Sequence, residues 1–436
     1  MLMLAHLLAC APETAAPLSV ATVERMGPTV ARVSWTTSEP GIGFVRYNLP
    51  GERPRETRRD LVATTDHELV VAGMTPSSAW TLTAVTEIEG DEVHTAPVQV
   101  DTEAIPAGAA KIGAIEGEMQ STNYLLETTL GGAEGVVIYD QAGSVVLSLP
   151  ILLGRLGARS RLDAGGSTLS VGVFDAEVLE NSYIATFGLD GEELVRASAP
   201  YGHHDFVAIP EGWAYLALDT RVYQGEQITG DVVVEIDLEG NELRRVWSAW
   251  DAWTPSGPME TGFYGPSADW THANTLEYLA ATDEYLVSIH NLSTVIQVDR
   301  GTGEITRQIG GEDSELSLTS GKAFVHQHSP SLRGDALTVF DNTSGDVSEV
   351  RGYRIKQSEG TYAQSWHIPN PANTYVPVLG DVYRTDEGQT LTSWGSTGIL
   401  AEFDAEGEQT FRLDLSLGAG FGFFQPISEL GGPAPD

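Results

Sequence analysis

Short apolar segments that alternate with polar residues recur along nearly the whole chain, and turn residues separate them. An alternation with a period of two predicts strands with one buried face. The N-terminal examples are residues 31–35, 43–47, 67–71, 79–85 and 93–100. The 47 glycines and 22 prolines, together with the lack of a 3.6-residue periodicity, favour an all-β chain.

A longer pattern begins near Lys111, where an apolar strand ends in Asp, turns at Gly and returns as a second strand. Five copies end at Asp140, Asp190, Asp237, Asp299 and Asp404, with turn glycines Gly143, Gly191, Gly240, Gly303 and Gly407. A degenerate sixth copy, residues 353–356 turning at Gly360, fills the one double-length gap. Units of this size cannot bury both faces alone, so the repeat predicts a six-bladed β-propeller.

The two patterns divide the chain. We expect an apolar signal segment and tether over residues 1–18, a β-sandwich over 19–103, a linker over 104–110 and the propeller over 111–436. A linker of this kind predicts two independent cores.

The first domain resembles the immunoglobulin-like fibronectin type III sandwich at two places. Trp35 stands where that family has the core Trp of its second strand, and Met74-Thr75-Pro76-Ser77-Ser78-Ala79-Trp80 is similar to its tyrosine corner, with Trp80 in the Tyr position. The resemblance implies a spacing or docking role, because the segment carries no chemical motif.

Charge narrows the range of partners. The net charge is −37, from 61 acidic and 24 basic side chains. Such a surface repels phosphate backbones, which excludes nucleic-acid binding through a basic face.

The single cysteine, Cys10, follows an apolar segment, and Leu7-Leu8-Ala9-Cys10 resembles the lipobox of bacterial lipoproteins. The resemblance implies lipidation of Cys10, export, and anchoring to a membrane through the lipid, with a periplasmic or outer-membrane location. The alternative is an ordinary apolar N-terminus with a chance cysteine.

Histidines recur at one place in the repeat. Three units open their inner strand with histidine, in His203-His204-Asp205-Phe206, Trp270-Thr271-His272-Ala273-Asn274 and His326-Gln327-His328-Ser329. Equivalent positions in successive blades lie at equal radius, so we expect these side chains to face one another at one end of the central channel. His290 and Asn342 follow the next strands of two of these units. A lone histidine in such a strand is more often structural, but recurrence favours a shared site.

These segments resemble the bacterial arylsulfate sulfotransferase family over about residues 200–345. The resemblance implies a six-bladed propeller that transfers a sulfuryl group from a phenolic sulfate to a phenol through a histidine intermediate, without a cofactor. It implies that His328 is the nucleophile and that His204 and His272 assist catalysis. The substrate-binding set would be Asn274, His290, His203 and Asn342.

One departure from the family leaves other functions open. The family has an arginine where this chain has His290, so anion binding would require a protonated His290. Neutral imidazoles also suit a transition metal, and copper, zinc or iron could be held by His204, His272, His290, His326 and His328. A third possibility is a non-catalytic propeller scaffold.

Overall fold

The computed structural model describes residues 20–106, 112–130, 135–151, 156–175, 177–256, 259–261, 267–416 and 420–435. Cys10 and the expected signal segment lie outside these residues, as does most of the expected linker. The described chain is almost entirely β, with one short α-helix, α1 (Ala249–Ala252), and 3-10 turns η1 (Leu179–Asn181), η2 (Gln357–Glu359) and η3 (Gly395–Thr397). None of its helices is long and apolar enough to cross a membrane.

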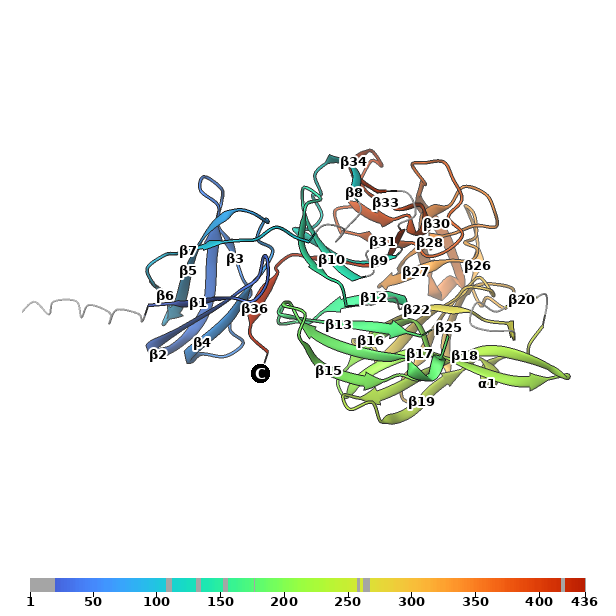
Figure 1. Ribbon diagram of the computed structural model, residues 1–436. Coiled ribbons are helices and arrows are strands. Elements are labelled where there is room, and N and C mark those ends of the chain that lie inside the picture. The colour runs from blue at the N-terminus through green and yellow to red at the C-terminus, as the bar shows by residue number, and fades with distance from the viewer. Residues whose placement is uncertain are drawn as a thin grey trace, which may run out of the picture.

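Six sheets of antiparallel strands form the blades of a propeller (Figure 1). The first contains β35 (Gly420–Ile427), β9 (Tyr124–Leu130), β10 (Gly135–Asp140) and β11 (Val145–Leu149). The second contains β12 (Leu156–Leu162), β13 (Thr168–Phe174), β14 (Tyr183–Gly188) and β15 (Glu193–Ser198). The third contains β16 (Gly202–Ile209), β17 (Gly212–Tyr223), β18 (Glu226–Asp237) and β19 (Glu242–Ser248), with β20 (Glu260–Thr261) and β21 (Ala268–Asp269) added along β18.

The remaining blades follow the same order from the axis outwards. The fourth contains β22 (Ala273–Leu279), β23 (Glu284–Ile289), β24 (Thr294–Asp299) and β25 (Ile305–Gly310). The fifth contains β27 (His328–Arg333), β28 (Ala336–Asp341), β29 (Glu349–Lys356), β30 (Thr361–Pro369) and β26 (Ser317–Leu318). The sixth contains β31 (Asp381–Arg384), β32 (Thr390–Ser393), β33 (Ile399–Phe403), β34 (Gln409–Leu415) and β8 (Ile112–Gly117). The prediction of six blades is confirmed.

Both ends of the propeller sequence close the ring. The C-terminal strand β35 is the innermost strand of the first blade, and β8 is the outermost strand of the sixth. Each end of this segment is thus paired within a blade built mainly from the other end, which leaves no exposed blade edge at the junction.

The Asp–Gly repeat has the expected local geometry. Each copy is the hairpin between the third and fourth strands of a blade counted from the axis. At Asp237, for example, Oδ1 accepts hydrogen bonds from the backbone N–H groups of Glu239 (3.0 Å) and Asn241 (2.8 Å). Gly240 takes a φ of 85°, a conformation that costs glycine little.

The N-terminal strands form a separate sheet system on the outside of the propeller, at the left of Figure 1. They are β1 (Thr22–Arg25), β2 (Ala31–Asn48), β3 (Arg55–Glu56), β4 (Thr64–Val71), β5 (Ala79–Ile88), β6 (Asp91–His94) and β7 (Val98–Asp101). The expected strands 31–35 and 43–47 are one long strand, β2, which pairs first with β4 and then with β5. The expected strand 93–100 is two strands, β6 and β7.

Two tryptophans singled out in this region are buried and anchored. Trp35 donates its indole N–H to Thr86 Oγ1 (2.8 Å) and stacks on His67. Trp80 donates to the carbonyl of Thr75 (3.3 Å), a bond back to the upstream chain like that of a tyrosine corner. The fibronectin-like character of the domain remains a prediction.

The N-terminal strands have a hydrophobic core of their own around Trp35 and Trp80, but they also pack against the propeller. One hydrophobic cluster joins Val30 and Val70 of the N-terminal strands to Leu126 and Ile138 of the first blade. The C-terminal strand β36 (Gly431–Pro433) leaves the propeller and pairs with β4 (Figure 1). The last residues of the expected propeller segment therefore belong to the N-terminal sheet, because the chain returns to the first domain after closing the ring.

Candidate active site

The catalytic histidines predicted from sequence lie where the inner strands of three blades begin. Register pairs His203–Leu216, Ala273–Ile289 and His328–Phe340 each come directly before a β-bulge. The paired residue just before the bulge is His203, Ala273 or His328. His204 comes one residue after it, His272 one residue before it, and His328 is that residue itself, so the three histidines occupy neighbouring rather than identical positions in the repeat.

Three histidines of these segments have an unusual backbone conformation, which changes the direction of their side chains. His204 and His272 both have a φ of 52°, and His326 has a φ of 55°. Positive φ is uncommon for a non-glycine residue and interrupts the alternation of side chains along a strand. Strained residues of this kind concentrate at functional sites.

The imidazole rings form a continuous cluster. Ring centroids lie 4.8 Å apart for His204 and His272, 5.1 Å for His272 and His290, and 5.4 Å for His290 and His328. His326 stacks on His290 at 4.7 Å. We name His204, His272, His290, His326 and His328 the histidine cluster. It brings together side chains from three blades, as the sequence predicted.

The orientation of His328 is set by Asn342. Nδ1 of His328 lies 2.7 Å from Oδ1 of Asn342. The amide group of Asn342 donates to the carbonyls of Val376 (2.9 Å) and Leu379 (2.8 Å), which fixes Oδ1 toward the imidazole. An amide oxygen can only accept, so Nδ1 of His328 carries the proton and Nε2 carries the lone pair. Asn342 thus lies behind the imidazole.

His290 has the same arrangement. Its Nδ1 lies 2.7 Å from Oδ1 of Asn291, whose amide group donates to the carbonyl of Asp269 (3.1 Å). The neutral form of His290 therefore also carries its lone pair on Nε2.

His272 has a different partner. Its Nδ1 lies 2.6 Å from Oδ2 of Asp269, three residues earlier in the chain. A carboxylate stabilises a protonated imidazole, whereas an amide oxygen does so only weakly. Within the described histidine cluster, His272 is the imidazole held by a carboxylate. Asp269 was not among the predicted site residues, although its place beside His272 in the sequence could have identified it.

His203 lies behind the cluster. Its side chain is buried, its Nε2 lies 3.0 Å from Oδ1 of Asp231, and its Nδ1 lies 2.8 Å from Nδ1 of His204. Asp231 also accepts from the backbone N–H of Ala273 (2.6 Å). His203 therefore links His204 to a buried carboxylate.

Burial keeps most of the cluster uncharged. Desolvation lowers the pKa of His328 to about 3 and lowers the pKa values of His204 and His290 well below the ordinary value. Electrostatic repulsion among neighbouring histidines, His272 among them, lowers these three pKa values further. The lowered pKa of His290 disfavours the protonated form that anion binding at this position was expected to require.

Asn274 braces two blades. It is fully buried, its amide group donates to the carbonyl of Gln327 (2.8 Å), and its Oδ1 accepts from Thr275 Oγ1 (3.3 Å). Its complete burial, rather than saturation of its amide, separates Asn274 from any substrate on the surface of the site.

Sequence reasoning missed the aromatic neighbour of His328. The ring of Phe423, on β35, lies 6.3 Å from that of His328 between centroids, and the guanidinium of Arg159 lies 4.1 Å from the Phe423 ring. β35 reaches the axis only because it closes the ring, so no local pattern could have placed Phe423 there.

The ligand set proposed for a metal does not have the required arrangement. Across the part of the chain that the structure describes, no three His, Cys, Asp or Glu side chains are placed to hold a metal ion. The five imidazoles instead contact one another edge to face, tilted or stacked.

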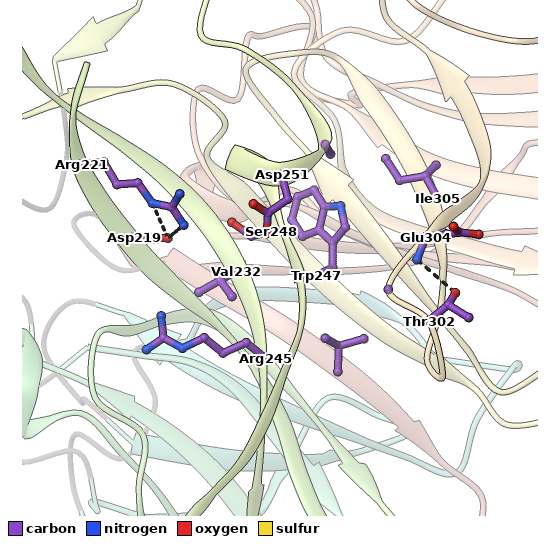
Figure 2. A pocket seen from close by; sticks show the side chains of 13 residues that line it. Asp219, Arg221, Val232, Arg245, Trp247, Ser248, Asp251, Thr302, Glu304 and Ile305 are labelled. Atoms are coloured by element: carbon purple, nitrogen blue, oxygen red, sulfur yellow. Dashed lines mark hydrogen bonds and ion pairs between the residues drawn. The ribbon is translucent and has the colours of Figure 1, made fainter. Parts of the chain in front are cut away.

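A separate hollow of about 490 Å³ lies between the third and fourth blades (Figure 2). Trp247 and Arg245 of β19 line one wall, and Thr302 and Ile305 of the β24–β25 hairpin line the other. None of the predicted site residues lines it.

Solved structures give only distant similarities. A Bacteroides caccae protein of unknown function is 14% identical, covers 70% of this chain and 99% of its own, and has a TM-score of 0.42. The periplasmic gluconolactonase of Pseudomonas aeruginosa is 11% identical, covers 72% of this chain and 97% of its own, and has a TM-score of 0.38. Neither score is high enough to support an inference.

No curated protein matches the chain. The family model described as arylsulfotransferase (ASST) matches residues 118–414. This span contains every residue of the histidine cluster and covers more than half of the sequence. The protein therefore belongs to the arylsulfotransferase (ASST) family.

Proposed function

We propose that this protein transfers a sulfuryl group from a phenolic sulfate to a phenolic acceptor through a covalent intermediate on Nε2 of His328. The observation that carries the proposal is the bond from Nδ1 of His328 to Asn342, which leaves the Nε2 lone pair available for attack. The low pKa of His328 supports the same role, since a nucleophilic imidazole must be neutral.

In the first half-reaction, Nε2 of His328 forms a bond to sulfur and the bond from sulfur to the phenolic oxygen breaks. The leaving oxygen takes a proton from His272, whose protonated form is stabilised by Asp269. In the second half-reaction, an acceptor phenol returns its proton to His272 and its oxygen attacks sulfur, which regenerates neutral His328.

The charge of a sulfate ester also needs a partner. We infer that protonated His272 supplies the cation for which the family uses an arginine at the position of His290. A bound anion would also raise the pKa values of His204 and His290, because it opposes the burial and mutual repulsion that lower them. Substrate binding would then be coupled to proton uptake by these two histidines.

The direct test is turnover of 4-nitrophenyl sulfate with phenol as acceptor, measured together with metal content. We expect His328→Ala to lose turnover by at least about a thousandfold, because a missing nucleophile has no substitute. The matched control is His94→Ala, a change at an exposed histidine of β6. Turnover by His328→Ala at the wild-type rate would refute the proposal, as would wild-type turnover that vanishes on chelation.

A second experiment tests the role of His272. Asp269→Asn should slow transfer from phenyl sulfate much more than from 4-nitrophenyl sulfate, because the more acidic phenol leaves without help from a proton donor. An equal loss for both donors would contradict proton transfer by His272 and indicate a purely positional role for Asp269.

A further inference from the structure

A buried ion-paired group lies next to the histidine cluster, since its member Asp205 directly follows His204 on β16. Arg159 of β12 donates from Nε to Oδ1 of Asp205 (3.2 Å) and from Nη1 to Oδ2 of Asp381 (3.2 Å). These three side chains come from three blades and are almost fully buried. We name Arg159, Asp205 and Asp381 the ionic layer.

A pocket borders the ionic layer, and Arg159 and Asp381 form part of its wall. Its volume is about 210 Å³, and the later residues of the inner strands line it, among them Arg161, Glu277, Arg333 and Tyr383. The inner strands β22 and β27, which begin at the histidine cluster, carry Glu277 and Arg333 of this pocket at or near their other ends. We name it the distal pocket.

The distal pocket is lined by basic and acidic side chains whose hydrogen-bonding and charge requirements are not fully met by the protein. Arg161 donates to the carbonyl of Phe206 (2.7 Å) and to Asp205 Oδ1 (3.1 Å), an oxygen that it shares with Arg159. Desolvation lowers the pKa of Arg161, so its positive charge is incompletely compensated. An added anion would stabilise it.

Glu277 is the acidic counterpart. Among the described residues, its buried Oε2 has no hydrogen-bond partner, although Arg161, Arg159 and Arg333 all exert electrostatic effects on it. A buried acceptor with no partner costs free energy, which a ligand with a donor group would recover. Arg333 is half-exposed, donates to the carbonyl of Arg384 (3.3 Å) and lies 3.9 Å from Oδ1 of Asp386.

We propose that the distal pocket binds a small organic carboxylate that also carries a hydroxyl or ammonium group. The carboxylate would lie between Arg161 and Arg333, and the donor group would bond Glu277. The two arginines would repel a simple cation, and Glu277 would repel an inorganic anion. A ligand that carries both a carboxylate and a donor group therefore fits best. The ring of Tyr383, which also lies beneath the guanidinium of Arg333, offers an apolar wall for the carbon skeleton.

The test is calorimetric titration of the full chain with L-alanine and L-lactate, and with acetate and sulfate as probes that lack the donor group. We expect saturable binding of L-alanine or L-lactate, and binding of acetate and sulfate that is weaker by about tenfold, the effect of one charge-assisted hydrogen bond. Arg333→Gln and Glu277→Gln should each weaken binding to a similar extent. The control, Arg354→Gln, removes an exposed arginine that pairs with Asp335 outside the pocket.

Three results would overturn the proposal: no saturable heat from L-alanine or L-lactate, equal affinity for sulfate, or unchanged affinity in both pocket variants. Sulfuryl transfer does not enter these measurements, and His328→Ala should bind the probes as the wild type does. Failure of the distal pocket would therefore leave the proposed transfer reaction untouched, and the converse also holds.

Discussion

The histidine cluster and the ionic layer are neighbours near the propeller axis. Their polar side chains differ in how many hydrogen-bond and ion-pair partners they have. His204 and Asp205 are neighbours on β16. Asp205 accepts from Arg159, from Arg161 and from the backbone N–H groups of Phe206 (2.8 Å) and Leu276 (3.0 Å). In the histidine cluster, by contrast, an amide, carboxylate or imidazole partner lies within hydrogen-bond distance of Nδ1 in His328, His290, His272 and His204.

The difference separates structural from chemical roles. Fully paired charges fix the relative positions of the inner strands, because any movement would leave a buried charge unpaired. Imidazoles held at one nitrogen keep a fixed orientation and retain a second nitrogen for chemistry. On β16, Asp205 therefore contributes to rigidity, and its neighbour His204 contributes to reactivity.

The largest expected effect comes from breaking the ionic layer. Arg159→Met should lower the free energy of unfolding by about 3–5 kcal/mol, because it leaves Asp205 and Asp381 buried with less compensation. The matched control, Arg354→Met, removes an exposed ion pair and should cost less than about 1 kcal/mol. Denaturant unfolding of both variants measures the difference, and equal losses would contradict a structural role for the layer.

The second prediction concerns the pH dependence of the free energy of unfolding, to which the histidine cluster and the ionic layer contribute differently. His204, His290 and His328 have lowered pKa values in the fold, so the unfolded chain binds more protons between its ordinary histidine pKa and the lowered values. This contribution to stability is fully present above about pH 6.5 and is lost as the pH drops toward about 3, by up to about 1.4 kcal/mol per pH unit for each histidine. Unfolding curves at several pH values measure this slope.

Replacing His328 by Gln should reduce that slope by about one third, since one of three titrating groups is removed. Asp381 acts in the opposite direction, because burial raises its pKa and its folded form then binds a proton more readily than the unfolded chain, so its contribution to stability increases as the pH falls. An unchanged slope in His328→Gln would mean that the cluster is protonated in the fold.

The smallest effect tests the support behind the nucleophile. Asn342→Ala should lower kcat by about 10–100-fold, with little change in KM, because Nδ1 of His328 loses the acceptor that fixes its tautomer. Asn370→Ala removes another buried amide of the fifth blade and should leave kcat unchanged. A loss confined to KM would place Asn342 in substrate binding instead.

Much of the fold was predictable from sequence because its signals are local. The Asp–Gly hairpins and the alternation of apolar residues predicted six blades, and the histidine segments predicted a shared cluster. Contacts between distant segments were not predictable. The pairing of β36 with β4, the place of Phe423 beside His328, and the pairing of Arg159 with Asp381 all depend on how the ring closes.

The ionisation of the site also depends on three-dimensional packing. His290 in place of an arginine suggested a protonated imidazole, but burial beside His272 and His328 keeps it neutral. Asp269 was visible in the sequence as a carboxylate near His272, yet only the 2.6 Å contact identifies it as the partner of that imidazole.

The central claim is that Nε2 of His328 carries the sulfuryl group between donor and acceptor. The most direct measurement is peptide mass spectrometry. The protein is incubated briefly with 4-nitrophenyl sulfate without an acceptor phenol and is then digested under alkaline conditions. The account predicts one added sulfuryl group on the peptide that contains His328, removed when phenol is supplied and absent from His328→Ala. An unmodified His328 peptide during active turnover, or a sulfuryl group on another residue, would contradict it.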